Sequence, residues 1–396
     1  MPHGMHLQSG MLAGGGACER GRCALSSAMR ILLAADKFKG SLSGPEVATA
    51  LRRALGLLLP GAEIDACPIA DGGEGTVDAL LTALGGERVS VAAQDARGRL
   101  IEATYGLLPT PQGNSAVLEM SAASGLARVA DLPLDPVSAS TFGTGQMLLD
   151  AVQRGAVRIL LGLGGSATHD GGSGMAEALG FRFLNSRGEP LQGMPVGLEQ
   201  VDRILPPSPL VLPPIQVACD VTNPLLGPQG ATHVYGPQKG ITCDLLEPME
   251  QRLEKLAELC RRDLGTDPRT VAGAGAAGGL GFGLMAFCRA TLVSGFDLIA
   301  GMANLRDRVA AADLIITGEG RMDAQTLHGK GPVGVARMAR SLGKRVIGIG
   351  GGIERSAALE AEFDLLLATK PDEMPLDQAM REAARLIEET VERHAS

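Results

Sequence analysis

Short apolar runs recur along the chain, and glycines or an acidic residue follow each of them. Polar positions do not alternate within these runs, which is typical of strands covered on both faces, as in a parallel sheet. The runs lie at 31–35, 157–163, 215–219, 314–317 and 346–349. Helical spacing at 43–59, 145–154, 332–342 and 376–394 completes the pattern, and together they predict an α/β fold with a parallel sheet.

Between residues 87 and 120 the pattern changes to alternation of apolar and polar positions. The segments 88–92, 100–107 and 116–120 predict antiparallel strands, joined by turns at 97–98 and 113–114. A second, mixed α/β region in the middle of the chain is therefore expected. Since single cores stop growing at roughly 250–300 residues, a chain of 396 residues also predicts two domains.

Composition narrows the classes of function. A net charge of −8, no Trp and two Tyr argue against a nucleic-acid partner, which would require a basic surface and stacking aromatics. Seven cysteines without a C-x-x-C pair predict reduced thiols in a cytoplasmic protein. The uncharged stretch 270–288 has six glycines and predicts a glycine-rich loop entering a buried helix, so we expect no membrane segment.

Residues 1–28 are rich in glycine and lack periodicity and the apolar stretch of a signal peptide. We expect them to be a disordered extension, or to precede the true start at Met29.

Carboxylates follow the apolar runs. Asp36, Asp71, Asp220 and Glu319 each stand beside Gly, Lys or Asn. Any one of them could simply cap the next helix. Four that converge at the carboxyl edge of a parallel sheet, with lysines and glycine loops, predict a site for Mg²⁺ and phosphate.

Two segments near the N-terminus carry part of this pattern. Lys39, followed by Gly-Ser after the first strand, is a candidate anion contact. In 70–76, Asp71 and Glu74 stand among three glycines. Acids there could favour a helix dipole, but so many glycines cost backbone entropy and indicate a close approach.

Segment 164–172 follows a strong strand and opens a helix. Its hydroxyls and backbone amides predict an anion loop. His169 within it could act as an acid or base, although a single loop histidine is more often merely exposed.

The last cluster comprises 318–323 and 328–331. Arg321 and Lys330 supply positive charge, while Glu319 and Asp323 could bind metal or accept a proton. An ion pair between Arg321 and Asp323 is the plain alternative.

A different class is suggested by residues 273–278, which match G-x-G-x-x-G. A nicotinamide-dependent oxidoreductase would need a strand directly before this run, and Pro268 and Arg269 occupy that place. The chain also lacks a G-x-x-x-x-G-K-[ST] loop and the protein-kinase motifs.

Taken in order, these motifs resemble the bacterial glycerate kinase family of glycolate and glucarate breakdown. The resemblance runs from about Met29 to the C-terminus, so that 1–28 lie outside it, and His169 stands where Asn is expected. The segments that carry it are 36–43, 70–76, 164–172, 218–225, 235–240, 273–279, 317–323 and 328–330.

The resemblance implies a Rossmann-like or flavodoxin-like domain from 29–85 and 295–396, with a mixed α/β domain, 86–294, inserted into it. It also implies ATP, Mg²⁺ and transfer of the γ-phosphoryl group to D-glycerate, at the 2-hydroxyl. A homodimer is one possible oligomeric state. Another small-acid kinase on the same scaffold, an oxidoreductase and a non-catalytic binding protein are the alternatives.

On this basis we expect Asp71, Glu74 and Asp220 to organise Mg²⁺ or the glycerate hydroxyls, with Asp71 as the general base. Lys39, Arg321 and Lys330 would neutralise carboxylate and phosphates, and Glu319 and Asp323 would bind metal. The remaining expected nucleotide or substrate contacts are Gly165, Ser166, Thr168, Asp170, Asn223, Gly275 and Gly278.

Overall fold

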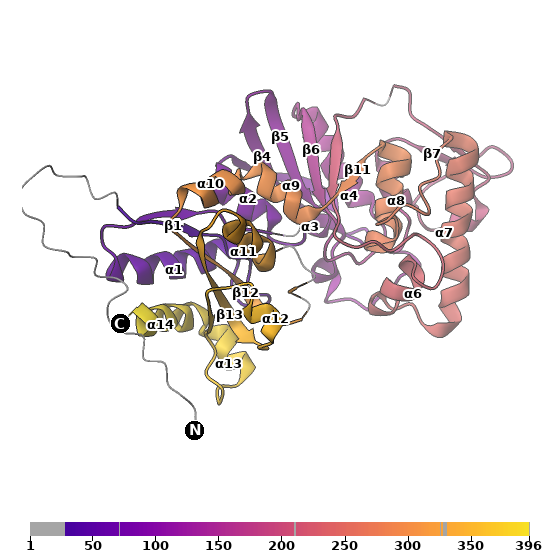
Figure 1. The fold of residues 1–396 in the computed structure, drawn as a ribbon. Helices are drawn as coiled ribbons and strands as arrows, with labels where there is room; N and C mark the ends of the chain where they lie inside the picture. Colours follow the sequence, from indigo (N-terminus) through magenta and orange to yellow (C-terminus); the bar gives the residue numbers. More distant parts are fainter. Residues whose placement is uncertain (1–27, 71, 210, 325, 328–330, 396) are drawn as a thin grey trace, which may run out of the picture.

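The computed structural model describes residues 28–70, 72–209, 211–324, 326–327 and 331–395 (Figure 1). The expected disordered extension and the expected contacts Asp71 and Lys330 thus lie outside the described residues, apart from Ala28 at the end of the extension.

A five-stranded parallel sheet is built from both ends of the chain. Its order is β14-β13-β12-β1-β2. The strands are β1 (Arg30–Leu33), β2 (Glu63–Ala66), β12 (Leu314–Met322), β13 (Arg345–Ile353) and β14 (Leu365–Ala368). The chain leaves β1 toward β2 on one side and returns through β12 on the other, so the crevice beside β1 and β12 is the topological switch point.

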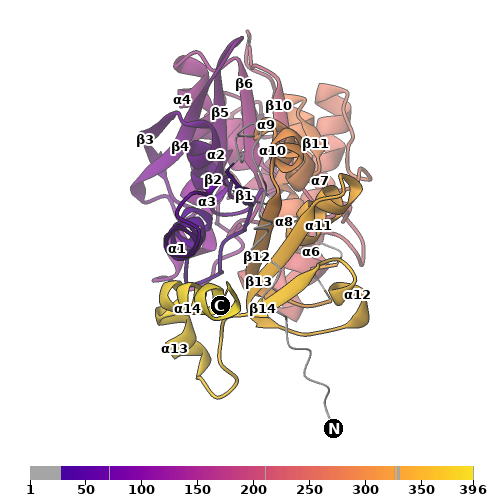
Figure 2. The ribbon, with the colours of Figure 1, turned by 60° about the vertical axis from the view of Figure 1, so that its left-hand side comes forward.

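Both faces of this sheet are covered by helices. Ile31 and Leu33 pack with α1 (Gly44–Leu58) and α14 (Ala383–Ala395) on one face. Leu32 packs on the other face with α9 (Gly295–Met302), α10 (Leu305–Ala311) and α11 (Pro332–Ser341). Figure 2 shows α1 and α14 on one side of β1 and β12, and α11 on the other. This double burial explains the unbroken apolar runs.

The middle of the chain forms a six-stranded mixed sheet, ordered β11-β10-β6-β5-β4-β3. The pairs β3–β4 and β4–β5 are antiparallel and the others are parallel. The strands are β3 (Glu87–Gln94), β4 (Leu100–Thr110), β5 (Gly113–Glu119), β6 (Arg158–Gly162), β10 (Ile215–Ala218) and β11 (Thr291–Val293). A small antiparallel sheet adds β7 (Arg182–Leu184), β8 (Pro190–Leu191) and β9 (Arg203–Leu205).

Helices cover this second sheet too. Its largest core includes residues of α4 (Phe142–Gln153), α7 (Cys243–Leu264) and α8 (Ala276–Cys288). On the opposite face, α2 (Thr76–Leu84) and α9 pack through Val77, Leu80 and Ile299. The other helices of the described residues are α3 (Ser121–Ser124), α5 (Ser173–Ala178), α6 (Ala231–Tyr235), α12 (Ala357–Glu360) and α13 (Leu376–Arg381). Short 3-10 turns are η1 (Leu126–Val129), η2 (Leu198–Gln200) and η3 (Pro237–Lys239).

Three predictions of local structure were wrong. The strands expected to end at 317 and 349 continue as β12 and β13, because Glu319 and Arg321 still pair with Gly350 and Gly352. The turn after β4 lies at 111–112, where Pro111 cannot donate to a ladder. The single helix expected over 376–394 is two helices, α13 and α14, which break at Glu382.

The fold class is confirmed: an α/β protein with one parallel sheet and a second mixed sheet. The strands of the first sheet come from 30–66 and 314–368, and those of the other two from 87–293, while the expected domain boundaries stay a prediction. In the part of the chain that the structure describes, every helix is too short or too polar to span a bilayer.

Candidate active site

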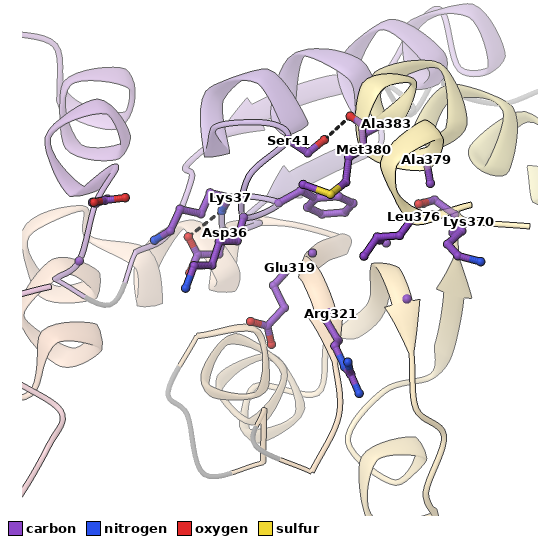
Figure 3. A pocket seen from close by; sticks show the side chains of 18 of the residues that line it. Asp36, Lys37, Ser41, Glu319, Arg321, Lys370, Leu376, Ala379, Met380 and Ala383 are labelled. Atoms are coloured by element: carbon purple, nitrogen blue, oxygen red, sulfur yellow. Dashed lines mark hydrogen bonds between the residues drawn. The ribbon is translucent and has the colours of Figure 1, made fainter. Parts of the chain in front are cut away.

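A cavity of about 1220 Å³ opens beside the carboxyl ends of β1 and β12. Its lining comes from the turn after β1, the 73–74 turn, the 164–165 turn after β6, the ends of β12 and β13, and helices α13 and α14. Figure 3 shows Asp36, Lys37, Glu319 and Arg321 around its polar part. Since drug-sized ligands occupy roughly 300–1,000 Å³, the cavity has room for a nucleotide and a small acid.

The turn after β1 is held by hydrogen bonds to β12 and to its own Asp36 side chain. The Asp36 N–H donates to the Gly318 carbonyl (2.8 Å), and the Lys37 N–H donates to Asp36 Oδ1 (2.6 Å). Ser43 then caps α1 through a capping box with Glu46, whose pKa these hydrogen bonds lower. Lys39 is exposed at the cavity wall, as an anion contact would need.

Two glycine turns approach each other at the cavity. A Cβ built on Gly164 would lie 2.6 Å from Gly73 Cα, and one on Gly165 would lie 2.7 Å from Glu74 Oε1. Gly165 also has a left-handed φ of +75°, which only glycine adopts without strain. The glycines let the 73–74 and 164–165 turns share one wall, which brings Glu74 to the cavity.

Glu319 and Arg321 lie within β12, and both line the cavity. The Arg321 side chain is 73% exposed and forms ion pairs with Asp323 (3.1 Å) and Glu354 (3.3 Å). Such exposed pairs stabilise a fold by only about 0–1 kcal/mol, so Arg321 can exchange them for a ligand anion. Asp323, which was expected to bind metal, forms this ion pair with Arg321 and does not line the cavity.

The described residues include no group of three or more His, Cys, Asp or Glu that could hold a metal by itself. Mg²⁺, however, usually binds one or two carboxylates together with substrate phosphates. Asp36 and Glu319 both reach the cavity, so the carboxylate oxygens present fit a magnesium ion carried by a nucleotide.

Beyond Gly165, the predicted anion loop turns away from the cavity. Ser166 and Thr168 are buried, and neither lines the cavity. Beneath them lies Lys239, 2% exposed, whose Nζ donates to the Thr168 carbonyl (2.7 Å) and to Ser166 Oγ (3.3 Å). Burial lowers the pKa of Lys239 to about 7, although the Asp170 carboxylate opposes this shift.

Asp170 is fully buried and is engaged by its own chain. Its Oδ2 accepts from the Thr141 N–H (2.8 Å), the Thr141 hydroxyl (2.7 Å) and the Gly174 N–H (3.1 Å), and its Oδ1 accepts from the Gly172 N–H (3.0 Å). Burial raises the pKa of this carboxyl, and these hydrogen bonds oppose the rise. Asp170 thus fixes the loop to the start of α4 and to α5.

His169 is also fully buried, so the expectation of an exposed histidine was wrong. Its Nε2 lies 3.1 Å from the Thr232 hydroxyl, while its Nδ1 has no hydrogen-bond partner among the described residues. Burial, with Lys239 and Arg252 nearby, lowers the pKa to about 3. A neutral imidazole in this position packs the loop rather than exchanging protons with a substrate.

The glycines of 273–279 allow this segment to pack closely against the backbone of neighbouring loops. A Cβ on Gly278 would lie 2.0 Å from the Thr168 carbonyl, and one on Gly275 would lie 2.2 Å from the Pro224 carbonyl. Asn223 holds the neighbouring loop by accepting from Tyr235 (2.6 Å) and donating to the Gln229 carbonyl (2.8 Å). Residues 265–275 contain no strand. A dinucleotide-binding fingerprint requires a strand directly before the glycine run, so this run does not meet that requirement.

Asp220 follows β10 and accepts from the Gly295 N–H (3.2 Å) at the start of α9. It is not in the cavity lining, although Ala218, two residues earlier, lies against Gly72. Of the expected site residues, the structure therefore gathers Lys39, Glu74, Gly165, Glu319 and Arg321. The other expected residues that it describes lie outside the cavity lining.

Sequence reasoning missed two features. Lys239 belongs to the segment 235–240, but the sequence indicated no role for it, because no local pattern marks a lysine for complete burial. The apolar side of the cavity, formed largely by α13, was also missed, because the pattern there was interpreted as one continuous helix.

Residues 31–396 match the model of the glycerate kinase family. A glycerate kinase from Bacillus subtilis is 42% identical over 367 residues, which cover 91% of this chain and 96% of the relative. The glycerate 2-kinase of Escherichia coli is 39% identical over 364 residues, covering 90% and 94%. A crystal structure from Salmonella typhimurium LT2, assigned as a glycerate kinase 2, superposes with a TM-score of 0.82 at 40% identity, covering 93% and 97%.

The motifs shared in order, the cavity at the switch point and these matches over nearly the whole chain agree, and the chain belongs to the glycerate kinase family.

Proposed function

We propose that this chain transfers the γ-phosphoryl group of ATP to D-glycerate at the 2-hydroxyl, giving 2-phosphoglycerate and ADP. The observation that carries the proposal is the composition of one cavity wall, where lysines, carboxylates and glycine backbone meet at the switch point of a parallel sheet. The Escherichia coli relative named glycerate 2-kinase supports the choice of hydroxyl.

Phosphoryl transfer requires positioning and charge stabilisation more than covalent chemistry. Lys37, Lys39 and Arg321 supply cations around the cavity, where they would neutralise phosphate and carboxylate charge. Asp36 and Glu319 would hold Mg²⁺, which when bound would supply positive charge against the phosphates. The backbone of the 164–165 turn approaches the same space without side chains in the way.

A carboxylate must also accept the proton of the glycerate hydroxyl. Asp71 belongs to the motif 70–76, and we assign it this role because Gly73 and Glu74 of the same motif line the cavity. We expect Asp71→Asn to lower kcat by about 10²–10⁴-fold. A loss below about tenfold would move the role of base elsewhere, with Glu74 as the next residue to replace.

The proposal is tested by an ADP-release assay with ATP, Mg²⁺ and D-glycerate, in which phosphorus NMR resolves the product. A 2-phosphoglycerate signal supports it in full. A 3-phosphoglycerate signal would overturn the choice of hydroxyl, and turnover of another hydroxy acid alone would make this a different small-acid kinase. Folded protein that turns over none of these substrates would contradict the activity as a whole.

A further inference from the structure

The cavity has an apolar end that the proposed chemistry does not use. Leu376, Ala379 and Met380 of α13 form it with Phe38 and Ile353; we call these five residues the apolar wall. Figure 3 shows Leu376, Ala379 and Met380 on one side of Glu319, with Asp36 and Lys37 on the other. The side with Asp36 and Lys37 is therefore mainly charged, and the opposite side is mainly apolar, with Arg321 and Lys370 bordering it.

The apolar wall is held in place by the turn that carries the lysines. The Ser41 hydroxyl donates to the Met380 carbonyl (2.6 Å), and a Cβ on Gly40 would lie 2.8 Å from Met380 Cε. Behind α13, helix α14 packs against α1 in the sheet's core. Phe38 and Ala379 are buried, whereas Leu376 is 66% exposed. A fixed wall that leaves a leucine open to the cavity matches a ligand with a flat apolar part.

The two substrates differ in how well they fit this wall. Every carbon of glycerate carries oxygen, so the acid has no apolar surface to bury there. ATP carries a flat aromatic base at the end opposite the phosphoryl group that is transferred. Since ligand sites are mostly apolar with a few polar groups that fix orientation, the wall suits the base and the charged end suits the phosphates.

Resting on the proposed kinase function, we propose that the apolar wall binds the adenine base of ATP. The triphosphate then runs past Glu319 and the lysines of the 36–41 turn toward the 164–165 turn. The glycerate subsite consequently lies at the Glu74 end of the cavity, which fixes the direction of transfer along it.

The absence of tryptophan from the chain allows a direct test. Leu376→Trp would place the only indole of the protein on the apolar wall. Leu100→Trp is the matched control, because Leu100 is a 77% exposed leucine of β4 outside the cavity lining. We expect ADP and ATP to quench the emission of Leu376→Trp by stacking, D-glycerate to leave it unchanged, and Leu100→Trp to respond to none of them.

Kinetics give a second, independent measurement. Burying a leucine-sized apolar group contributes about 1.5–3 kcal/mol. Leu376→Glu should therefore raise the KM for ATP about tenfold or more, with little change in the KM for D-glycerate. A rise confined to D-glycerate, or quenching by D-glycerate in place of nucleotide, would overturn the assignment.

Failure of the assignment can be told apart from failure of the function. If wild-type protein turns over ATP and D-glycerate while Leu376→Trp ignores ADP, the adenine assignment is wrong and the kinase stands. If wild-type protein shows no turnover and no ADP binding in equilibrium dialysis, both are wrong.

Discussion

The two glycine-rich segments 164–165 and 275–279 look alike in the sequence but lie in different surroundings. Gly165 and Gly278 share a left-handed backbone, with φ of +75° and +68°. The closest atom to a Cβ on Gly165 is the end of the flexible Glu74 side chain, whereas on Gly278 it is the backbone carbonyl of Thr168. A glycine cluster therefore indicates that something approaches closely, but not whether it is a site residue or the fold itself.

The largest effect should come from Gly278→Ala. The new Cβ would lie 2.0 Å from the Thr168 carbonyl, and left-handed backbone adds about 1–2 kcal/mol for a non-glycine residue. We expect the free energy of unfolding in urea to fall by at least about 3 kcal/mol. Gly343→Ala is the control, because its φ is +67° and it has nothing within 4 Å. Equal losses in the two variants would refute the packing role of Gly278.

Lys239→Met tests the buried surroundings of Gly278, where Lys239 and Gly278 both contact Thr168. It removes the 2.7 Å hydrogen bond to the Thr168 carbonyl, which should cost about 1–3 kcal/mol. With a pKa of about 7 in the fold and 10.5 as the ordinary value, Lys239 binds fewer protons when folded. It therefore makes wild-type stability rise with pH across this window.

Urea unfolding of the wild type and Lys239→Met at several pH values measures this contribution. The variant should show a smaller rise in stability above about pH 7. Parallel profiles in the two proteins would mean that Lys239 keeps an ordinary pKa.

Gly165→Ala tests the cavity side. Because the nearest atom to the Cβ would be the end of the Glu74 side chain, with Ser121 Cβ next at 3.2 Å, the fold should lose little more than the backbone strain of about 1–2 kcal/mol. Displacement of Glu74, by contrast, should lower kcat about tenfold or more, since small misplacements at a site are costly. Steady-state kinetics and urea unfolding of the same sample separate the two effects. A variant that unfolds like Gly278→Ala would break the comparison.

The smallest effect is expected for His169→Asn. With the pKa of His169 lowered to about 3 in the fold from 6.5, the unfolded chain takes up a proton that the native state does not as the pH falls below 6.5. This group therefore destabilises the protein in acid. The variant should lose about 1 kcal/mol less than wild type between roughly pH 6.5 and 5.5. An unchanged acid profile would show that the imidazole reaches water.

Local patterns predicted much of the fold. The apolar runs marked β1, β6, β10, β12 and β13, because strands buried on both faces leave no polar positions. The capping box at Ser43 and Glu46 marked the start of α1 within one residue. Strand ends were less predictable, since β12 and β13 continue as long as each finds a neighbour to pair with, and that neighbour is distant in sequence.

The candidate site was predictable only in part. The sequence by itself determined which residue types gather at the carboxyl edge of the sheet, because strand direction and glycine turns are local properties. The tertiary structure decided which of them face the cavity: it turned Gly165 and Glu74 toward it, and it buried Asp170 and Lys239. Burial depends on what packs over a residue from remote segments, and no local spacing encodes that.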